Sequence, residues 1–429
     1  MKTSTGMETL MRKLKMIVTD STLRRRVLFV LVALVLFRLL ANIPIPAAAG
    51  QNLGALLAND QALGFLNLLT GGGLSAVSIV MLGVGPYITA SIIMQLLTMM
   101  SPKIKAMQSE EGEIGRRRMT QYSRLLTVPL ALLQGYGLIA YLGQQGILVG
   151  LTPFEIFTNT IIVAAGSILL MWIGELISEF GIGNGVSLII FAGIVSSIPA
   201  TVSQLFFAFD VSQIPIFIAA IFATLLLIMA VVFMTEAERP VPITYAKQAR
   251  GGHSTGGTMT YLPLRVNQAG VIPIIFALSI LTIPAIVANA LAATGSGSVQ
   301  EIALFIQKVL ANGWINGAIY FFLVFVFTFF YTAVTFDPEA ISNNLQKNGA
   351  FIPGIRPGVS TAEYLSKILT RITLLGAVFL GLIAVIPLVM QNLTNIASLS
   401  IGGTALLIIV SVVLDLVKKI DAQITMREY

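Results

Sequence analysis

Long apolar runs dominate this chain and constrain its fold more than any other feature. A helix needs roughly 20 apolar residues, at about 1.5 Å per residue, to cross about 30 Å of hydrocarbon. With 56% hydrophobic and 10% charged residues and a mean hydropathy of +0.89, the chain has the composition of a protein that crosses the membrane many times. We predict ten spans, at 27–41, 76–98, 122–143, 154–177, 185–206, 213–234, 268–290, 314–335, 365–388 and 398–417.

The first of these runs also has features of a cleavable signal peptide, because a basic start precedes it and the stretch 46–50 has an A-x-A look. Arg38 within the run and the long basic segment before it favour a retained span instead. The spacing of apolar residues in 1–26 is typical of an amphipathic helix that lies at the membrane surface. We therefore predict a surface helix followed by the first span.

Lysine and arginine residues gather in alternate loops. They collect in the N-terminal segment, in 99–121, 236–266 and 336–364, and in the C-terminal tail, whereas the opposite loops hold only Lys308. A net charge of +7 could indicate a nucleic-acid partner, but in membrane proteins an excess of basic residues marks the cytoplasmic loops. The pattern predicts an even number of spans, with both termini in the cytoplasm.

The predicted spans are organised as an inverted repeat. The chain divides near residue 208 into halves 1–207 and 208–429 of five spans each, and an odd number of spans makes the halves run in opposite directions. Interrupted spans in matching positions of such halves point to a central pathway, although glycine and proline are also common in ordinary membrane helices. We predict an all-α polytopic membrane protein, with ten transmembrane helices in two inverted five-helix halves around a central pore. The second and seventh spans correspond, and both are interrupted, at Gly83, Gly85 and Pro86 and at Gly270, Pro273 and Pro284.

The stretch 65–98 contains the strongest of these interruptions. Its short apolar run 65–69 breaks at Thr-Gly-Gly-Gly (70–73), and the membrane-length segment that follows carries two glycines and a proline near its middle. Glycine and proline weaken helical hydrogen bonding, and lipid does not tolerate unpaired backbone groups. We therefore expect this stretch to lie inside the protein and not against lipid.

Most catalytic chemistry is excluded by residues that the chain lacks. It contains no cysteine, and its one histidine, His253, lies in a polar, glycine-rich loop. No G-x-x-x-x-G-K-[ST] motif is present, and the Gly-rich stretch 181–185 joins two apolar runs as a tight turn. A metalloprotease or an intramembrane serine or aspartyl protease would lack the residues that it needs. We predict a protein that is not an enzyme and that binds no cofactor or metal.

Charged residues within the spans distinguish a passive conduit from a pump. Glu175, Glu179, Asp415 and Arg38 all lie near the ends of their predicted spans. Ion-coupled transporters usually place ionisable groups near the midplane, because a buried charge is costly unless it is used. The pattern favours a conduit that is driven from outside. The alternative is an inverted-repeat secondary transporter of a small solute, with a sodium site built from backbone carbonyls.

Two basic loops project on the predicted cytoplasmic side. Residues 236–266 contain alternating runs around a Gly-rich turn, which predicts a hairpin. Residues 336–364 contain turn residues around Arg356. Basic projecting loops suit an RNA-rich or acidic partner, although they can also serve only to fix the topology.

Several long stretches resemble one known family, and the similarity covers essentially the whole chain. They are IPIP (43–46), GPYITASIIMQLLT (85–98), EGEIGRRRMTQYSR (111–124), GIGNGVSLIIFAGIV (181–195), NQAGVIPIIFA (267–277), FYTAVTFDPEAISNNLQKNGAFIPGIRPG (330–358) and GGTALLIIV (402–410). Together they resemble the SecY family of protein-conducting channel subunits. The resemblance implies a clam shell around an hourglass pore, which passes unfolded preproteins across the cytoplasmic (inner) membrane and releases transmembrane segments into it.

The resemblance also implies roles for individual residues. A ring of aliphatic side chains at the waist of the pore is implied at Val84, Ile88, Val186, Ile190, Ile275 and Ile408. A plug that blocks the external funnel is implied at about 62–75, with Phe65, Leu66, Asn67, Leu68, Leu69 and Gly72. A lateral gate between spans two and seven is implied at Gln95, Asn267, Pro86 and Pro273.

The partners implied by the resemblance are proteins and lipid. The SecA ATPase or the ribosome would bind the basic loops, with Lys247, Arg250 and Arg356 as contacts. SecE would clamp the two halves together, and SecG would be a further subunit. Signal sequences of preproteins and membrane lipid would meet the gate.

Overall fold

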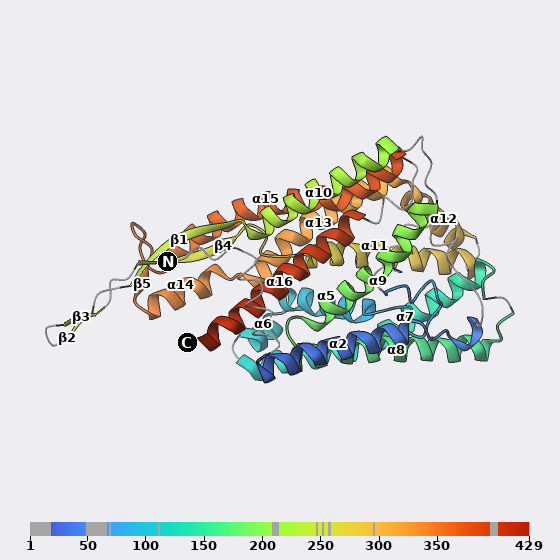
Figure 1. The fold of residues 1–429 in the computed structure, drawn as a ribbon, viewed down its shortest axis with the longest axis horizontal. Helices are drawn as coiled ribbons and strands as arrows, with labels where there is room; N and C mark the ends of the chain where they lie inside the picture. The colour runs from blue at the N-terminus through green and yellow to red at the C-terminus, as the bar shows by residue number, and fades with distance from the viewer. Residues whose placement is uncertain are drawn as a thin grey trace.

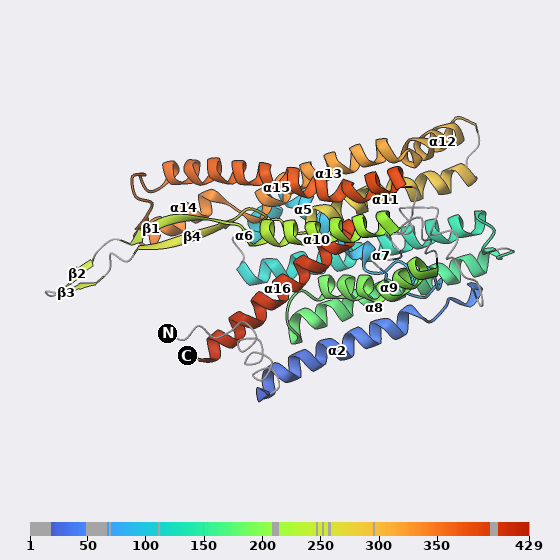
Figure 2. The same cartoon turned by 45° about the horizontal axis from the view of Figure 1, so that its top comes forward.

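The computed structural model describes residues 19–48, 67, 70–109, 112–148, 150–207, 214–245, 248–250, 253–255, 259–294, 297–394 and 402–428. Long helices lie side by side in an elongated bundle, and a strand hairpin projects from one end (Figure 1). The start of α2, the end of α16 and the strands lie at this end, whereas α12 lies at the opposite end (Figures 1 and 2).

Each predicted span overlaps one long helix. In the first part of the chain these helices are α2 (Ser21–Ala41), α5 (Gly85–Met100), α7 (Gly112–Gln144), α8 (Pro153–Phe180) and α9 (Gly185–Phe207), with a short 3₁₀ turn η1 (Pro46–Ala48) and α6 (Pro102–Ser109) between them. In the second part they are α10 (Ile214–Glu236), α11 (Ile272–Thr294), α13 (Gly313–Thr335), α15 (Val359–Thr394) and α16 (Gly402–Glu428).

Side-chain caps place the starts of several helices. Asp20 accepts hydrogen bonds from the backbone of the first turn of α2, and Asp337 does the same for α14 (Pro338–Lys347). Thr152 and Glu155 form a reciprocal capping box at the start of α8. These side chains pair backbone N–H groups that a helix start leaves without an intrahelical partner.

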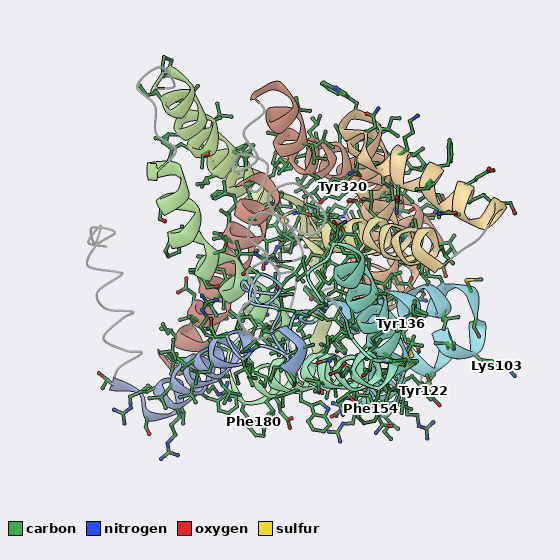
Figure 3. The ribbon with its side chains drawn as sticks, turned by 90° about the vertical axis from the view of Figure 1, so that its right-hand side faces the viewer. Lys103, Tyr122, Tyr136, Phe154, Phe180 and Tyr320 are labelled. Carbon is green, nitrogen blue, oxygen red and sulfur yellow. The ribbon has the colours of Figure 1, made fainter. Side chains whose placement is uncertain are left out.

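The surface of the bundle is that of a membrane protein. Among the described residues, four helices are long and apolar enough to cross a membrane, at Gly112–Gly143, Pro153–Phe180, Gly313–Lys347 and Val359–Ile386. Large side chains such as Tyr122, Tyr136, Phe154 and Phe180 extend outward from the bundle (Figure 3). The total of ten spans stays a prediction.

The prediction of span two is wrong over its first part. Residues 70–84 form turns and not a helix, and α5 begins only at Gly85. Gly83 has a φ of 58° and Val77 a φ of 46°, which an α-helix does not accommodate. Pro86 stands in the first turn of α5, where its missing N–H costs nothing, so it starts this helix and does not interrupt it.

Three short helices were not predicted: α6 in the loop 99–121, α12 and α14. The amphipathic α12 (Ser298–Ala311) is too short and too polar for a span, and it follows α11 at the end of the bundle away from the strands (Figure 2). α14 forms in the loop 336–364, where turns were expected. Span-length hydropathy does not detect helices of this length.

The predicted hairpin in 236–266 is confirmed. β1 (Glu238–Tyr245) pairs antiparallel with β4 (Met259–Arg265), and β2 (Gln248–Arg250) pairs with β3 (His253–Thr255) nearer the tip. The short β5 (Ala350–Phe351) pairs with the other edge of β1. The two basic loops are therefore joined in one sheet.

Helix α8 packs very closely on the irregular segment 70–84. A Cβ atom at Gly166 would lie 2.0 Å from the carbonyl oxygen of Ile79, so only glycine fits there. A glycine in an apolar span is typical of a place where two backbones approach closely.

We predict that Gly166→Ala destabilises the protein, because the added methyl group overlaps a backbone carbonyl that cannot move freely. Overpacking of this kind costs typically about 1–3 kcal/mol and sometimes more. The measurement is thermal unfolding in detergent. Gly135→Ala is the matched control, since its Cβ would meet no atom closer than 3.6 Å. Equal midpoints for the two variants would contradict the packing described here.

Candidate functional site

Six aliphatic residues from separate parts of the chain lie in or against the largest buried apolar cluster of the described residues. Ile190 and Ile408 are each 1% exposed, and Val84, Ile88 and Ile275 are also buried. Val186 is partly buried and packs against the same cluster. All six residues expected in the ring therefore lie in this one cluster or pack against it, from the start of α5 and from α9, α11 and α16.

The start of α5 is positioned by the turns before it. Ser167 on α8 donates a hydrogen bond to the carbonyl oxygen of Gly83 at 2.8 Å, and both groups are buried. The backbone N–H of Ile45 donates to Val77, and that of Ile79 donates to Ile43, each at 2.9 Å. Irregular backbone is tolerated at membrane depth only where protein satisfies it.

The irregular segment 70–84 lies inside the protein. The sequence analysis predicted this location for the longer stretch 65–98. Leu74, Val77 and Met81 are fully buried, in a second cluster with side chains of α7 and α8. A Cβ atom at Gly71 would lie 2.9 Å from the ring of Phe37 and 3.1 Å from the Cα atom of Gly193. The segment is thus held between α2 and α9 as well.

Helices α5 and α11 start in the same way. Gly83 precedes Pro86 by three residues and Gly270 precedes Pro273 by three, and the two glycines have φ angles of 58° and 62°. The ring residues Ile88 and Ile275 each follow their glycine by five residues. Pro284 differs from Pro86 and Pro273 in lying in the interior of its helix and not in the first turn. The two starts therefore share the spacing of a glycine, a proline and an isoleucine, which is consistent with an inverted repeat.

The first turn of α9 is positioned by glycines. A Cβ atom at Gly185 would lie 1.9 Å from the carbonyl oxygen of Gly174 on α8, and the N–H of Gly185 donates to the hydroxyl of Ser178 at 2.8 Å. This close turn presents Val186 beside α8 and Ile190 one turn further along the same face.

The expected plug is described only in part. Phe65, Leu66, Leu68 and Leu69 lie outside the described residues. The side chain of Asn67 accepts a hydrogen bond from the N–H of Ser75 at 2.8 Å, and its carbonyl accepts one from the N–H of Gly72 at 2.8 Å. Arg38 donates to the carbonyl of Gly71 and to the hydroxyl of Ser196 on α9. Asn67 and Gly72 thus belong to a turn that these hydrogen bonds hold.

The expected gate residues stand on, or directly before, two helices from different parts of the chain that pack against each other. α11 packs against α5 and against α7. The side-chain oxygens of Gln95 on α5 and Asn267 before α11 are buried, and the described part of the protein offers neither a hydrogen-bond partner. Pro86 and Pro273 stand in the first turns of these helices.

The structure describes two of the three residues that were expected to contact a partner through their positive charge. Lys247 lies outside the described residues. Arg250 ends β2, where it pairs in register with His253. Arg356 has an exposed side chain, and its carbonyl accepts a hydrogen bond from Thr361 at 2.8 Å, which shapes the turn. Since β5 pairs with β1, the loops that carry Arg250 and Arg356 lie at the same end of the molecule.

Sequence reasoning missed the residues that support the site. Ser167 and Gly166 on α8 position the start of α5, and Arg124 on α7 forms an ion pair of 2.8 Å with Glu175 on α8. A Gly-Ser pair within an apolar span is the signal that could have indicated close packing. The described residues contain no group of three or more His, Cys, Asp or Glu that could hold a metal ion.

Comparisons with known proteins agree with this arrangement. A sequence model of the SecY family matches residues 78–417. The protein translocase subunit SecY of Streptomyces scabiei is 42% identical over 426 residues, which covers 95% of this chain and 96% of that protein. A solved structure described as a protein-conducting channel superposes with a TM-score of 0.66 at 20% identity and covers 94% of this chain and 93% of its own.

Sec61 in the canine ribosome-channel complex from the endoplasmic reticulum superposes with a TM-score of 0.62 at 20% identity, and the match covers 94% of this chain and 93% of that one. These two likenesses establish the fold, and the sequence matches establish the family. The chain is a multi-pass membrane protein and belongs to the SecY family of protein translocase subunits.

Proposed function

We propose that six aliphatic residues in or against the buried cluster form the waist of a protein-conducting pore. The observation that supports this proposal is that one buried cluster includes or touches residues from four places in the chain, namely Val84, Ile88, Val186, Ile190, Ile275 and Ile408. The chain is a channel and not an enzyme, as its family membership shows, and it passes unfolded preproteins across the membrane. The relatives do not support the alternative of a small-solute transporter.

Aliphatic side chains suit a pore that must accept any sequence. They grip a passing chain by dispersion and make no specific hydrogen bonds with it. A narrow apolar constriction also tends to dewet, which limits the leakage of ions. The ring then serves as a seal and as a contact for the translocating chain.

The segment 62–75 is the plug in this proposal, and α5 and α11 are the two sides of the lateral gate. The hydrogen-bonded turn that contains Asn67 and Gly72 would stay in place while the rest of the plug moves. Separation of α11 from α5 and α7 would open a path from the pore to lipid. An apolar segment of roughly 20 residues would then leave sideways, because lipid favours it.

The halves 1–207 and 208–429 are the two moving bodies in this proposal. The matched starts of α5 and α11 support an inverted repeat. The excess of Lys and Arg in the loops at the end with the strands supports cytoplasmic termini in the inner membrane.

The partners act at that end. The ribosome of the canine complex supports a ribosome as one partner of the basic loops, and the SecA ATPase is the other. Lys247, Arg250 and Arg356 would make the contacts. SecE and SecG would complete the complex, with signal sequences and lipid at the gate.

We expect a cysteine at position 88 to crosslink to a translocating chain. The protein has no native cysteine, so Ile88→Cys is unique, and the substrate is a stalled preprotein carrying one cysteine. The measurement is disulfide formation in vesicles that contain the complex. Leu226→Cys on the exposed face of α10 is the control. A crosslink at 226 without one at 88 would refute the ring.

We expect Asn267→Leu to stabilise the closed gate. Its buried oxygen has no hydrogen-bond partner among the described residues, which costs roughly 1–3 kcal/mol, and leucine removes that cost. Relative to the unmodified protein, the variant should then slow the translocation of preproteins with weakly apolar signal sequences more than that of preproteins with strongly apolar ones. Asn344→Leu on the exposed face of α14 should leave this selectivity unchanged. Equal rates for both substrates in the 267 variant would argue against the gate assignment.

We expect the double variant Arg250→Glu and Arg356→Glu to bind SecA or ribosomes roughly fivefold more weakly or worse. An exposed ion pair contributes up to about 1 kcal/mol, and charge reversal adds repulsion. The measurement is a binding titration at low and high salt, and the difference should shrink as salt rises. Lys308→Glu, in α12 at the opposite end, is the control and should bind normally. Binding lost equally in the control would count against these contacts.

A further inference from the structure

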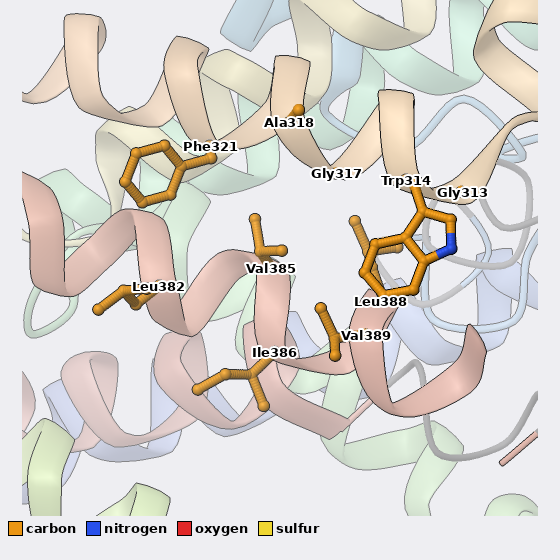
Figure 4. Close-up of a pocket in the computed structure, with 10 residues that line it drawn as sticks. All are labelled: Gly313, Trp314, Gly317, Ala318, Phe321, Leu382, Val385, Ile386, Leu388 and Val389. Carbon is orange, nitrogen blue, oxygen red and sulfur yellow. The ribbon is translucent and has the colours of Figure 1, made fainter. Parts of the chain in front are cut away.

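An apolar groove runs along the outside of the bundle between α13 and α15. It has a volume of about 480 Å³, and all ten residues that line it are apolar. Trp314 and Phe321 lie toward its two ends, with Val385 and Leu388 between them (Figure 4). Its volume is within the range of small-molecule pockets, about 300–1,000 Å³.

Glycines on α13, which have no side chain, leave the groove open. Gly313, Gly317 and Phe321 follow one another at intervals of four residues, so they share the face of α13 that meets α15. A Cβ atom at Gly317 would lie 3.5 Å from Val385 and 3.7 Å from Leu388, at ordinary contact distance. The glycine is therefore not required for close packing, and a larger side chain there would occupy the groove.

The groove opens toward hydrocarbon. Both of its helices are among those long and apolar enough to cross the membrane. The exposed Trp314 stands in the first turn of α13, at the end of the molecule where α12 lies. Tryptophan at the end of a span is typical of the membrane–water boundary.

A positive charge lies in the helix that precedes this end of the groove. Lys308 lies in the last turn of α12 and is exposed, and Asn312 both ends α12 and caps α13. The two helices pack against each other there. An ammonium group at the headgroup level next to an apolar groove is complementary to a phosphate joined to an acyl chain.

We propose that this groove binds one acyl chain of a glycerophospholipid from the leaflet on the α12 side, with its phosphate near Lys308. A spanning helix, about 10–12 Å wide and 30 Å long, is far too large for it. α13 also packs against α11, so the bound chain would support a helix of the proposed gate. The inference depends on the membrane location of the protein and not on the ring, plug or gate.

The test uses the complete complex in vesicles with phosphatidylglycerol that carries a diazirine on one acyl chain. Peptides with 313–321 and 382–389 should be labelled most strongly after irradiation. Gly317→Leu should lower this labelling by roughly tenfold, because each displaced methylene costs about fourfold in affinity. Gly317→Ala, which fits without a clash, should give an intermediate value and shows that the fold is kept. Ala219→Leu adds the same side chain on the exposed face of α10 and should change nothing.

The headgroup contact is tested separately. Lys308→Gln should lower labelling by the phospholipid about fivefold and leave labelling by a diacylglycerol probe, which lacks the phosphate, unchanged. Three results would each overturn the proposal: wild-type labelling in Gly317→Leu, equally strong labelling of the α10 surface in the unmodified protein, or a crosslink from the groove to another polypeptide. Translocation assays do not enter this test, so its failure is distinct from failure of the pore.

Discussion

The fold of the protein depends on hydrogen bonds that pair the backbone N–H and C=O groups of residues 70–84. Turns in this segment expose N–H and C=O groups that lipid cannot satisfy, at a cost of several kcal/mol each. Hydrogen bonds to the backbone of Ile43 and Ile45 and to the side chains of Ser167 and Arg38 pair some of these groups. These partners come from α2, the turn after it and α8, so the three must stay together for α5 to begin where it does.

The consequence is a helix that begins at the central cluster. Ile88 in the first turns of α5 and Ile275 in the first turn of α11 share that cluster. From there α5 leads to α6 near the end with the strands, whereas α11 leads to α12 at the other end (Figure 1). Two helices that start at one point and run in opposite directions are what an inverted repeat places at a transport pathway.

Hydropathy predicted where the long helices lie, because apolar length is what the membrane requires of them. It failed at 76–84, since that stretch is apolar yet pairs with Ile43 and Ile45, a contact that no local pattern reveals. It also missed the amphipathic α12. The proposed ring residues were assigned only by family resemblance, and burial does not single them out, because Ile190 is no more buried than its neighbour Ile189.

The kinds of contact differ between the interior of each half and the surface where the halves meet. The polar contacts described above are directional and join elements of one half, as in Arg124–Glu175, Arg38–Ser196 and Ser167–Gly83. Lys418 and Glu236 likewise form an ion pair of 2.8 Å between α16 and α10. The shared cluster at Ile88, Ile275 and Ile408 is apolar, and its contacts have no fixed direction. An apolar contact can be replaced by the apolar side chains of a passing segment, whereas a broken buried hydrogen bond leaves an unpaired group. On the proposal that a translocating chain fills this cluster, opening between the halves costs less there than at the directional polar contacts.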